Sequence, residues 1–177
     1  MKKLIKILAA AFFFNMAALY AQGAEHEPKK DAHEEHQQHE EHAHSHHLSL
    51  FLGVTSELEK NVHAFTAGLD YEYRLPFLNR LLGVGALTDF AFFPEQTNAI
   101  FAGFVGIHPI GGLKILLAPG VETVFGLHPH TAFLGRVSLG YDIMISNFSI
   151  TPIASVDYIP ETKAVSLVYG LSAGIGF

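Results

Sequence analysis

The stretch 165–177 alternates between two kinds of residue, and this pattern constrains the fold more than any other feature of the chain. Apolar side chains occupy every second position: Val165, Leu167, Tyr169, Leu171, Ala173, Ile175 and Phe177. Glycine and serine fill most of the positions between them. Successive side chains of a β-strand point to opposite faces, so a period of two indicates a strand. The stretch is predicted to be a strand with one apolar face and one face of small or polar residues.

Turn-forming residues divide the chain from residue 48 onward into eight segments of this kind. Clusters rich in proline, glycine and asparagine recur every 12 to 20 residues, which is typical of successive antiparallel strands. The strands are expected at 48–58, 62–75, 82–93, 99–108, 113–125, 131–145, 148–159 and 164–177. Most of them can supply the roughly 9–11 residues that a tilted transmembrane strand requires. The sequence therefore predicts an all-β, eight-stranded antiparallel up-and-down barrel.

The direction of the apolar face decides between a membrane barrel and a soluble one. A soluble eight-stranded barrel, such as a lipocalin, would turn its apolar face inward and its charged face outward. Two observations favour the membrane barrel. The polar face is rich in glycine and serine, which suits a crowded interior, and aromatic residues lie toward the strand ends, as in the girdles of membrane barrels. These aromatic residues are Tyr71, Tyr73, Phe90, Phe92, Tyr141, Tyr158, Tyr169 and Phe177. The stretches 99–108 and 113–125 are apolar on both faces, so the pattern does not assign them.

The first residues have the pattern of a secretory signal peptide. Three lysines precede an apolar run from residue 7 to residue 21, and small residues follow. Residues 1–21 are expected to be removed, with cleavage as late as residue 23; the alternative is an N-terminal membrane anchor. No later segment is apolar enough for a transmembrane helix, and the absence of cysteine excludes disulfides and lipoprotein attachment. An exported chain with 49% hydrophobic residues and 16% charged residues then needs an apolar environment outside its own core.

The stretch 48–177 resembles the small outer-membrane β-barrels of the OmpA and OmpX type. The closest match runs from 134–142 through 151–158 to 169–177, and a terminal phenylalanine at Phe177 resembles the assembly signal of such barrels. The resemblance implies an outer-membrane location in a Gram-negative envelope, contact with outer-membrane lipid and lipopolysaccharide, and recognition of Phe177 by the barrel assembly machinery. The loops are shorter than is usual for this family, and no peptidoglycan-binding domain is expected after residue 177. The resemblance implies no particular activity.

The net charge of −6 belongs almost entirely to one segment. Residues 22–47 carry seven acidic residues against two lysines, so the expected barrel at 48–177 is nearly neutral. No basic surface for nucleic acid is present. The charged residues of the expected interior are Glu57, Asp70, Glu72, Asp89, Glu122, Asp142, Asp157, Arg74, Lys114 and Arg136. Buried charges have to pair, and an eight-stranded barrel is filled by its own side chains. A structural polar core is therefore expected, with a bound cation or a narrow ion path as the alternative.

Residues 22–47 form a low-complexity segment that is predicted to be disordered and to bind metal. Its histidines are His26, His33, His36, His39, His42, His44, His46 and His47. Imidazole suits zinc, copper and nickel, and neighbouring carboxylates can complete a coordination shell. On a rigid helix, a spacing of three residues rotates each step by about 60° from alignment, so His33, His36, His39 and His42 cannot share one site there. The pattern favours several exchangeable sites over one structural zinc; the alternative is a solvated acidic tail without a metal role.

The sequence also argues against an enzyme. Some eight-stranded outer-membrane barrels deacylate or acylate lipid A, and the deacylases need a histidine and a serine two residues apart on a strand, with an acid nearby. A close spacing of His and Ser lies around Ser45, outside the expected barrel. No catalytic residue is predicted.

An even number of strands places both ends of the barrel on one side, so the histidine-rich tail is expected in the periplasm. The preferred function is a non-enzymatic barrel with a metal-binding tail, and the alternative is a structural or adhesive barrel with an inert one.

Overall fold

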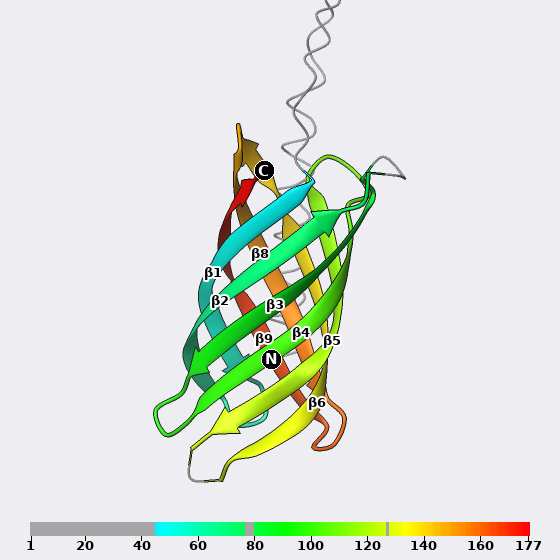
Figure 1. Ribbon diagram of the computed structural model, residues 1–177. Coiled ribbons are helices and arrows are strands. Elements are labelled where there is room, and N and C mark those ends of the chain that lie inside the picture. Colours follow the sequence, from blue (N-terminus) through cyan, green and yellow to red (C-terminus); the bar gives the residue numbers. More distant parts are fainter. Residues whose placement is uncertain (1–44, 77–79, 127) are drawn as a thin grey trace, which may run out of the picture. The chain divides into compact units, whose positions relative to one another are not determined.

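The computed structural model describes residues 45–76, 80–126 and 128–177, and these form a closed antiparallel β-barrel (Figure 1). The strands are β1 (His46–Glu57), β2 (Val62–Arg74), β3 (Leu82–Phe92), β4 (Thr97–Ile107), β5 (Leu113–Phe125), β6 (His130–Tyr141), β7 (Ile143–Ile145), β8 (Phe148–Ile159) and β9 (Ala164–Gly176). Each of β1 to β5 pairs with the next strand in sequence, β8 pairs with β6, β7 and β9, and β1 pairs with β9. The wall of the barrel therefore consists of eight strand positions, which we call staves, because the short β7 only extends β6 after a break. The predicted fold is confirmed, and every expected strand boundary lies within two residues of the observed one.

A single residue, Asp142, interrupts the stave that the sequence predicted as one strand over 131–145. The backbone N–H of Asp142 donates to the carbonyl oxygen of Gly112 at 2.7 Å, and the three residues of β7 then pair only with β8. The Asp142 side chain is buried in the lumen. The interruption therefore allows β7 to continue along β8 past the last pairs of β6, while β8 remains paired with β9 on its other side.

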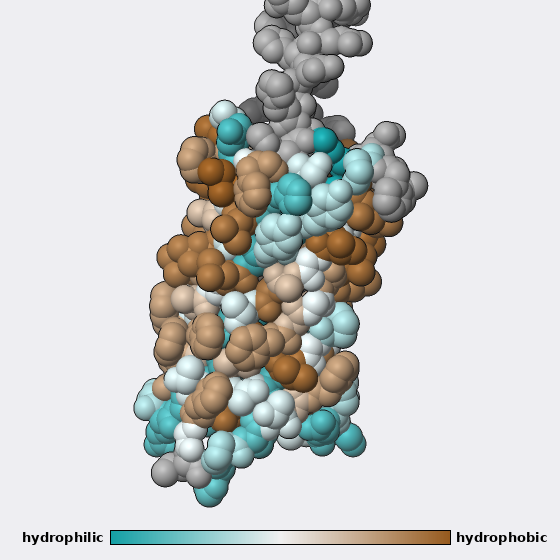
Figure 2. Space-filling model, in the orientation of Figure 1, coloured by the Kyte–Doolittle hydropathy of each residue, from teal (hydrophilic) through white to brown (hydrophobic). Residues whose placement is uncertain are grey.

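The outer wall of the barrel is apolar. Leucine, valine, isoleucine and phenylalanine residues point outward from every stave, with exposed fractions near one half for Leu50, Phe101 and Leu171. Figure 2 shows tan and brown side chains over the middle of the barrel and teal ones toward its lower end. In water, an apolar surface of this extent would promote aggregation, whereas the hydrocarbon core of a membrane accommodates it. The apolar face thus points outward, as the membrane interpretation predicted, and the soluble alternative is wrong in this respect.

The lumen contains both polar and apolar side chains, which explains why two strands could not be assigned from the sequence. β4 turns Ile100, Ala102 and Phe104 inward, and β5 turns Leu116 and Ala118 inward. Together with Leu87 and Leu134 they form a buried apolar cluster inside the barrel. These strands are therefore apolar on the outside because of lipid and apolar on the inside because of this cluster.

The ends of the barrel wall meet at a seam between β1 and β9. The backbone of His46 bonds to that of Phe177 in both directions, with N···O distances of 3.1 and 3.0 Å. The His46 ring stacks on the Phe177 ring, with 5.5 Å between their centroids. We call the end of the barrel at this seam the terminal end. The strand ends that lead into and out of the β2–β3, β4–β5 and β7–β8 connections lie at the terminal end, and those of the β1–β2, β3–β4, β5–β6 and β8–β9 connections lie at the opposite end.

Candidate functional site: the charged lumen

A group of ionisable side chains closes the lumen at the terminal end. Glu72, on β2, has a fully buried side chain that contacts two cationic or basic groups. The His108 Nε2 atom lies 2.6 Å from one carboxylate oxygen of Glu72, and the Lys114 Nζ atom lies 3.0 Å from the other. His108 follows β4 and Lys114 lies on β5, so three separate segments supply this group. Burial of Glu72 is tolerable because both of its oxygens have such a partner.

A second carboxylate, Asp142, extends this network across the lumen. Arg74 Nη2 donates to Asp142 Oδ2 at 2.7 Å, and Thr151 Oγ1 donates to Asp142 Oδ1 at 2.8 Å. The His108 Nδ1 atom lies 4.0 Å from Asp142, so His108 stands between the two carboxylates. The network joins β2, β5, the break after β6, and β8, and it therefore braces opposite walls of the barrel at one end.

Arg136 forms a separate network deeper in the barrel. Its guanidinium donates to Asp157 through Nε at 2.6 Å and through Nη2 at 2.9 Å, and its Nη1 atom donates to Asp89. All three side chains are almost completely buried. The fork of donors on an arginine matches the two oxygens of a carboxylate, and Asp89 and Asp157 approach from β3 and β8. Arg136, on β6, thus connects the adjacent strand β8, where Asp157 is its register partner, with the more distant β3.

Little free volume remains between these two networks. A cavity beside Arg136 has a volume of about 30 Å³ and is lined by Phe51, Leu87, Leu116, Ile153 and Val168 together with polar neighbours of Arg136. A space of this size holds very few water molecules. The predicted structural polar core is the arrangement found, and the ionisable side chains named as its members all face the lumen. The lumen of the described barrel is a packed interior.

A histidine and a serine meet inside the lumen, a contact that the sequence did not predict. His47 Nε2 lies 2.8 Å from Ser149 Oγ, and both residues are buried. The imidazole reaches β8 from β1 by passing over Gly174 of the strand between them; a Cβ atom at Gly174 would lie 2.5 Å from His47 Nε2. The glycine that the alternating pattern marked as merely small is thus required by a neighbour's side chain.

The eight histidines predicted to bind metal fall into two groups. His26, His33, His36, His39, His42 and His44 lie outside the described residues. His46 and His47 lie in β1, which begins two residues earlier than the expected boundary at residue 48. As successive strand residues, these two point to opposite faces: His46 packs outside against Tyr71, Tyr73 and Phe177, and His47 is buried inside. The barrel therefore does not bring this pair to one ion.

The sequence analysis missed His47 and His108 as lumen residues. His108 continues the inward positions 98, 100, 102, 104 and 106 of β4, but that parity was hidden because both faces of this strand are apolar. His47 was assigned to the tail because it follows seven other histidines. Its parity with the inward Ser49, Phe51 and Thr55 could have indicated its place.

Residues 45–76, 80–126 and 128–177 contain no group of three or more histidine, aspartate or glutamate side chains arranged to hold a metal ion. In the same ranges, no helix is long and apolar enough to cross a membrane.

Comparison with solved structures identifies the fold. The sequence itself matches no protein-family model and no curated protein. Neisserial surface protein A aligns over 75% of this chain and 96% of its own, with a TM-score of 0.54 and 10% identity. The N-terminal β-barrel domain of OprF from Pseudomonas aeruginosa aligns over 74% and 97%, with a TM-score of 0.52 and 13% identity. Such low identities bear on the fold alone. The chain has the fold of the small eight-stranded outer-membrane β-barrels.

Proposed function

We propose that this chain is a non-enzymatic outer-membrane protein of a Gram-negative envelope, which spans the membrane as a closed barrel and binds divalent transition metals through its histidine-rich N-terminal segment. The observation that carries the metal role is the density of ligands before β1. Six histidines and seven acidic residues lie between residues 22 and 45. Imidazole and carboxylate together suit zinc, copper and nickel.

The apolar exterior supports the membrane location. Leu139 and Leu171 are 41% and 56% exposed, while the charged Asp89, Arg136 and Asp157 are buried inside. This distribution suits hydrocarbon outside and a packed polar core inside. The lipid partners that follow are outer-membrane lipid and lipopolysaccharide.

The terminal end of the barrel is proposed to face the periplasm. His46 and Phe177 lie together there, as both ends of an even-stranded barrel must. Residues 22–45, which remain attached to β1, would then lie in the periplasm, where they could buffer, sense or deliver metal ions. His46 and His47 are held by the barrel wall, so the proposed ligands are His26, His33, His36, His39, His42 and His44.

The closed lumen supports a non-enzymatic role. His47 and Ser149 are 4% and 1% exposed, so neither side chain is accessible to a substrate from the surrounding solution. A structural or adhesive barrel with an inert tail is the alternative function, and a lipid A-modifying enzyme is a third.

A titration of purified mature protein in detergent separates these functions. Zn²⁺, Cu²⁺ and Ni²⁺ are added to the wild-type chain and to a variant in which the six tail histidines are changed to glutamine. Isothermal calorimetry should give more than one equivalent for the wild type and a large loss for the variant. Because ligating imidazoles must be neutral, and their unperturbed pKa is about 6.5, binding should weaken as the pH falls from about 7.5 to about 5.5.

A matched variant with His128→Gln and His130→Gln serves as the control, because these two histidines are exposed at the opposite end of the barrel. It should bind metal as the wild type does. Equal binding by the six-histidine variant would move the site to the barrel. No binding by the wild type would leave the structural barrel as the function.

A further inference from the structure

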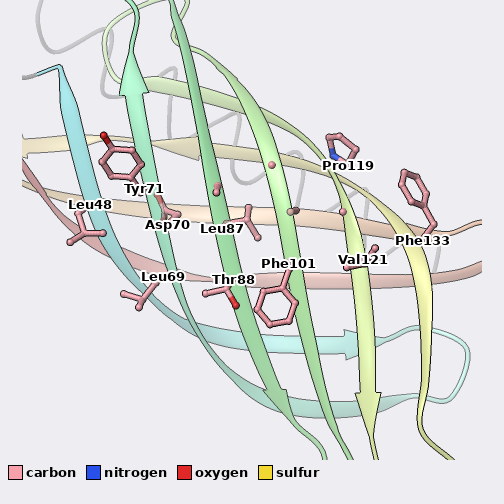
Figure 3. Close-up of a pocket in the computed structure, with 14 residues that line it drawn as sticks. Leu48, Leu69, Asp70, Tyr71, Leu87, Thr88, Phe101, Pro119, Val121 and Phe133 are labelled. Carbon is pink, nitrogen blue, oxygen red and sulfur yellow. The ribbon is translucent and has the colours of Figure 1, made fainter.

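We propose that an oblique groove on the outer wall of the barrel, across β2 to β6, binds one acyl chain of a glycerophospholipid whose headgroup lies at the terminal end. The groove has a volume of about 700 Å³. Figure 3 labels Tyr71, Phe101 and Phe133 among the side chains that line it, and these three lie at exposed positions on the outside of the barrel. The inference rests on the membrane location proposed above, and the experiment below distinguishes its failure from a failure of that location.

The floor of the groove consists of outward positions with small or compact side chains. Ala86 pairs with Gly103, and Pro119 follows on β5. The neighbouring row pairs Phe101 with Val121 and Val121 with Phe133, and these larger side chains form one wall. The hollow therefore results because small side chains on neighbouring strands lie next to a parallel row of large side chains on the same strands.

The barrel itself does not require the glycine in this floor. A Cβ atom at Gly103 would meet only the carbonyl oxygen of Gly85, at the ordinary distance of 3.8 Å. By contrast, inward glycines such as Gly174 lie under a neighbour's side chain. A glycine in a strand weakens it and often marks a place where a ligand approaches the backbone closely. At Gly103 the open space lies on the lipid side.

The groove descends from the terminal end toward mid-depth. Tyr71, at its upper end, lies three residues before the end of β2, whereas Pro119 is the middle residue of β5. Because the strands are tilted, a row of paired residues that crosses them runs obliquely along the wall. An acyl chain that enters the bilayer at the terminal surface would follow this course into the hydrocarbon.

The upper end of the groove is polar and the remainder is apolar. The hydroxyl group of Tyr71 lies 2.7 Å from Nδ1 of His46, at the seam. Tyrosine is typical of the interface between hydrocarbon and headgroups, and an imidazole beside it can donate to an ester or phosphate oxygen. This amphipathic arrangement matches one phospholipid better than a second barrel, because a convex barrel wall would rest on Phe101 and Phe133 without filling the floor between them.

Photolabelling in bilayers tests the proposal. The full mature chain is folded into phosphatidylethanolamine and phosphatidylglycerol vesicles that contain a trace of phosphatidylethanolamine with a diazirine on its acyl chain. After irradiation, labelled peptides are mapped by mass spectrometry. A diazirine near the glycerol should label the region of Tyr71, and one at the chain end should label the region of Val121 and Phe133. Both labels should exceed those on β8 and β9 at least fivefold.

Filling the floor provides the second measurement. The double variant Ala86→Leu and Gly103→Leu should reduce groove labelling at least fivefold, whereas the matched double variant Ala154→Leu and Ala173→Leu, on exposed sites of β8 and β9, should leave it unchanged. Both variants should keep the heat-dependent gel mobility of a folded barrel.

Uniform labelling of all staves would overturn the proposal in favour of ordinary annular lipid. A reversed order of the two labels would overturn it in favour of a lipid from the opposite leaflet. Protein–protein crosslinks through Ala86 and Gly103 that replace the lipid label would assign the groove to a second copy of the chain. Failure of the wild type to fold into vesicles would instead overturn the membrane location.

Discussion

At the scale of single residues, the stability of the lumen depends on buried charged side chains that pair with each other. Arg136 is 5% exposed and bonds to Asp89 and Asp157, which are 5% and 2% exposed. If the arginine were absent, two carboxylates would remain buried close together without a cation. Breaking a buried ion pair by removing one partner commonly costs about 3–5 kcal/mol, whereas replacing the whole set can be nearly neutral.

The variant Arg136→Met should therefore lower the free energy of unfolding by about 3–5 kcal/mol. The triple variant Arg136→Met, Asp89→Asn and Asp157→Asn should regain a large part of this loss, because no unpaired charge remains. Urea unfolding in detergent micelles, followed by heat-modifiable gel mobility, measures both. Lys60→Met, which removes an exposed lysine paired with Glu57, is the control and should change stability by less than about 1 kcal/mol. A triple variant as unstable as Arg136→Met would show that shape, and not charge, governs this part of the lumen.

At the scale of strands, the sequence predicts the positions of the strands and the direction of most of their faces. An apolar exterior and a polar interior require apolar and polar residues to alternate along each strand. β1, β2, β6 and β8 follow this rule. β4 and β5 do not, since the lumen contains an apolar cluster around Phe104 and Leu116, and two apolar faces produce no alternation. The contacts of His47 and His108 were equally hidden, because they join strands that are not neighbours in sequence.

Reversing the character of one outward residue tests these assignments. Leu171→Arg and Leu139→Arg place a cation on the lipid side near mid-depth, which costs about 2–4 kcal/mol in membrane barrels. Each should lower the yield of protein with heat-modifiable mobility after folding into vesicles. Ile145→Arg, in the hairpin at the terminal end, should cost only about 0–1 kcal/mol because the site lies near the interface. Equal folding of all three variants, or solubility of the wild type without detergent, would contradict the lipid-facing assignment.

At the scale of the whole molecule, the barrel is a ring of antiparallel hairpins closed by a single long-range pairing. β1 pairs with β9 from His47 with Gly176 to Glu57 with Ser166, and the aromatic rings of His46 and Phe177 stack beside the first of these pairs. A role of Phe177 in assembly is predicted because a terminal phenylalanine resembles the assembly signal of outer-membrane barrels. Its contact with the first strand adds a reason within the barrel, because Phe177 also covers the seam.

Deleting Phe177 should reduce the amount of folded protein in the outer membrane, since both the backbone pair with His46 and the stacked ring are lost. Fractionation of cells followed by gels of unheated samples measures this yield. Phe177→Tyr, which keeps an aromatic ring and the backbone, should remain close to the wild type. Normal insertion of the shortened chain would make Phe177 incidental to assembly.

The seam has a consequence for the order of folding. Its partners are separated by nearly the whole barrel sequence, so their contact is the last that local zipping of hairpins can reach, and contacts of this kind slow folding. Until β9 arrives, β1 and the growing sheet present two open edges, which are templates for pairing with other chains. A nascent chain is therefore most vulnerable just before its ring closes, and a chaperone that shields the exposed edge of β1 would act at the step where misassembly competes with maturation.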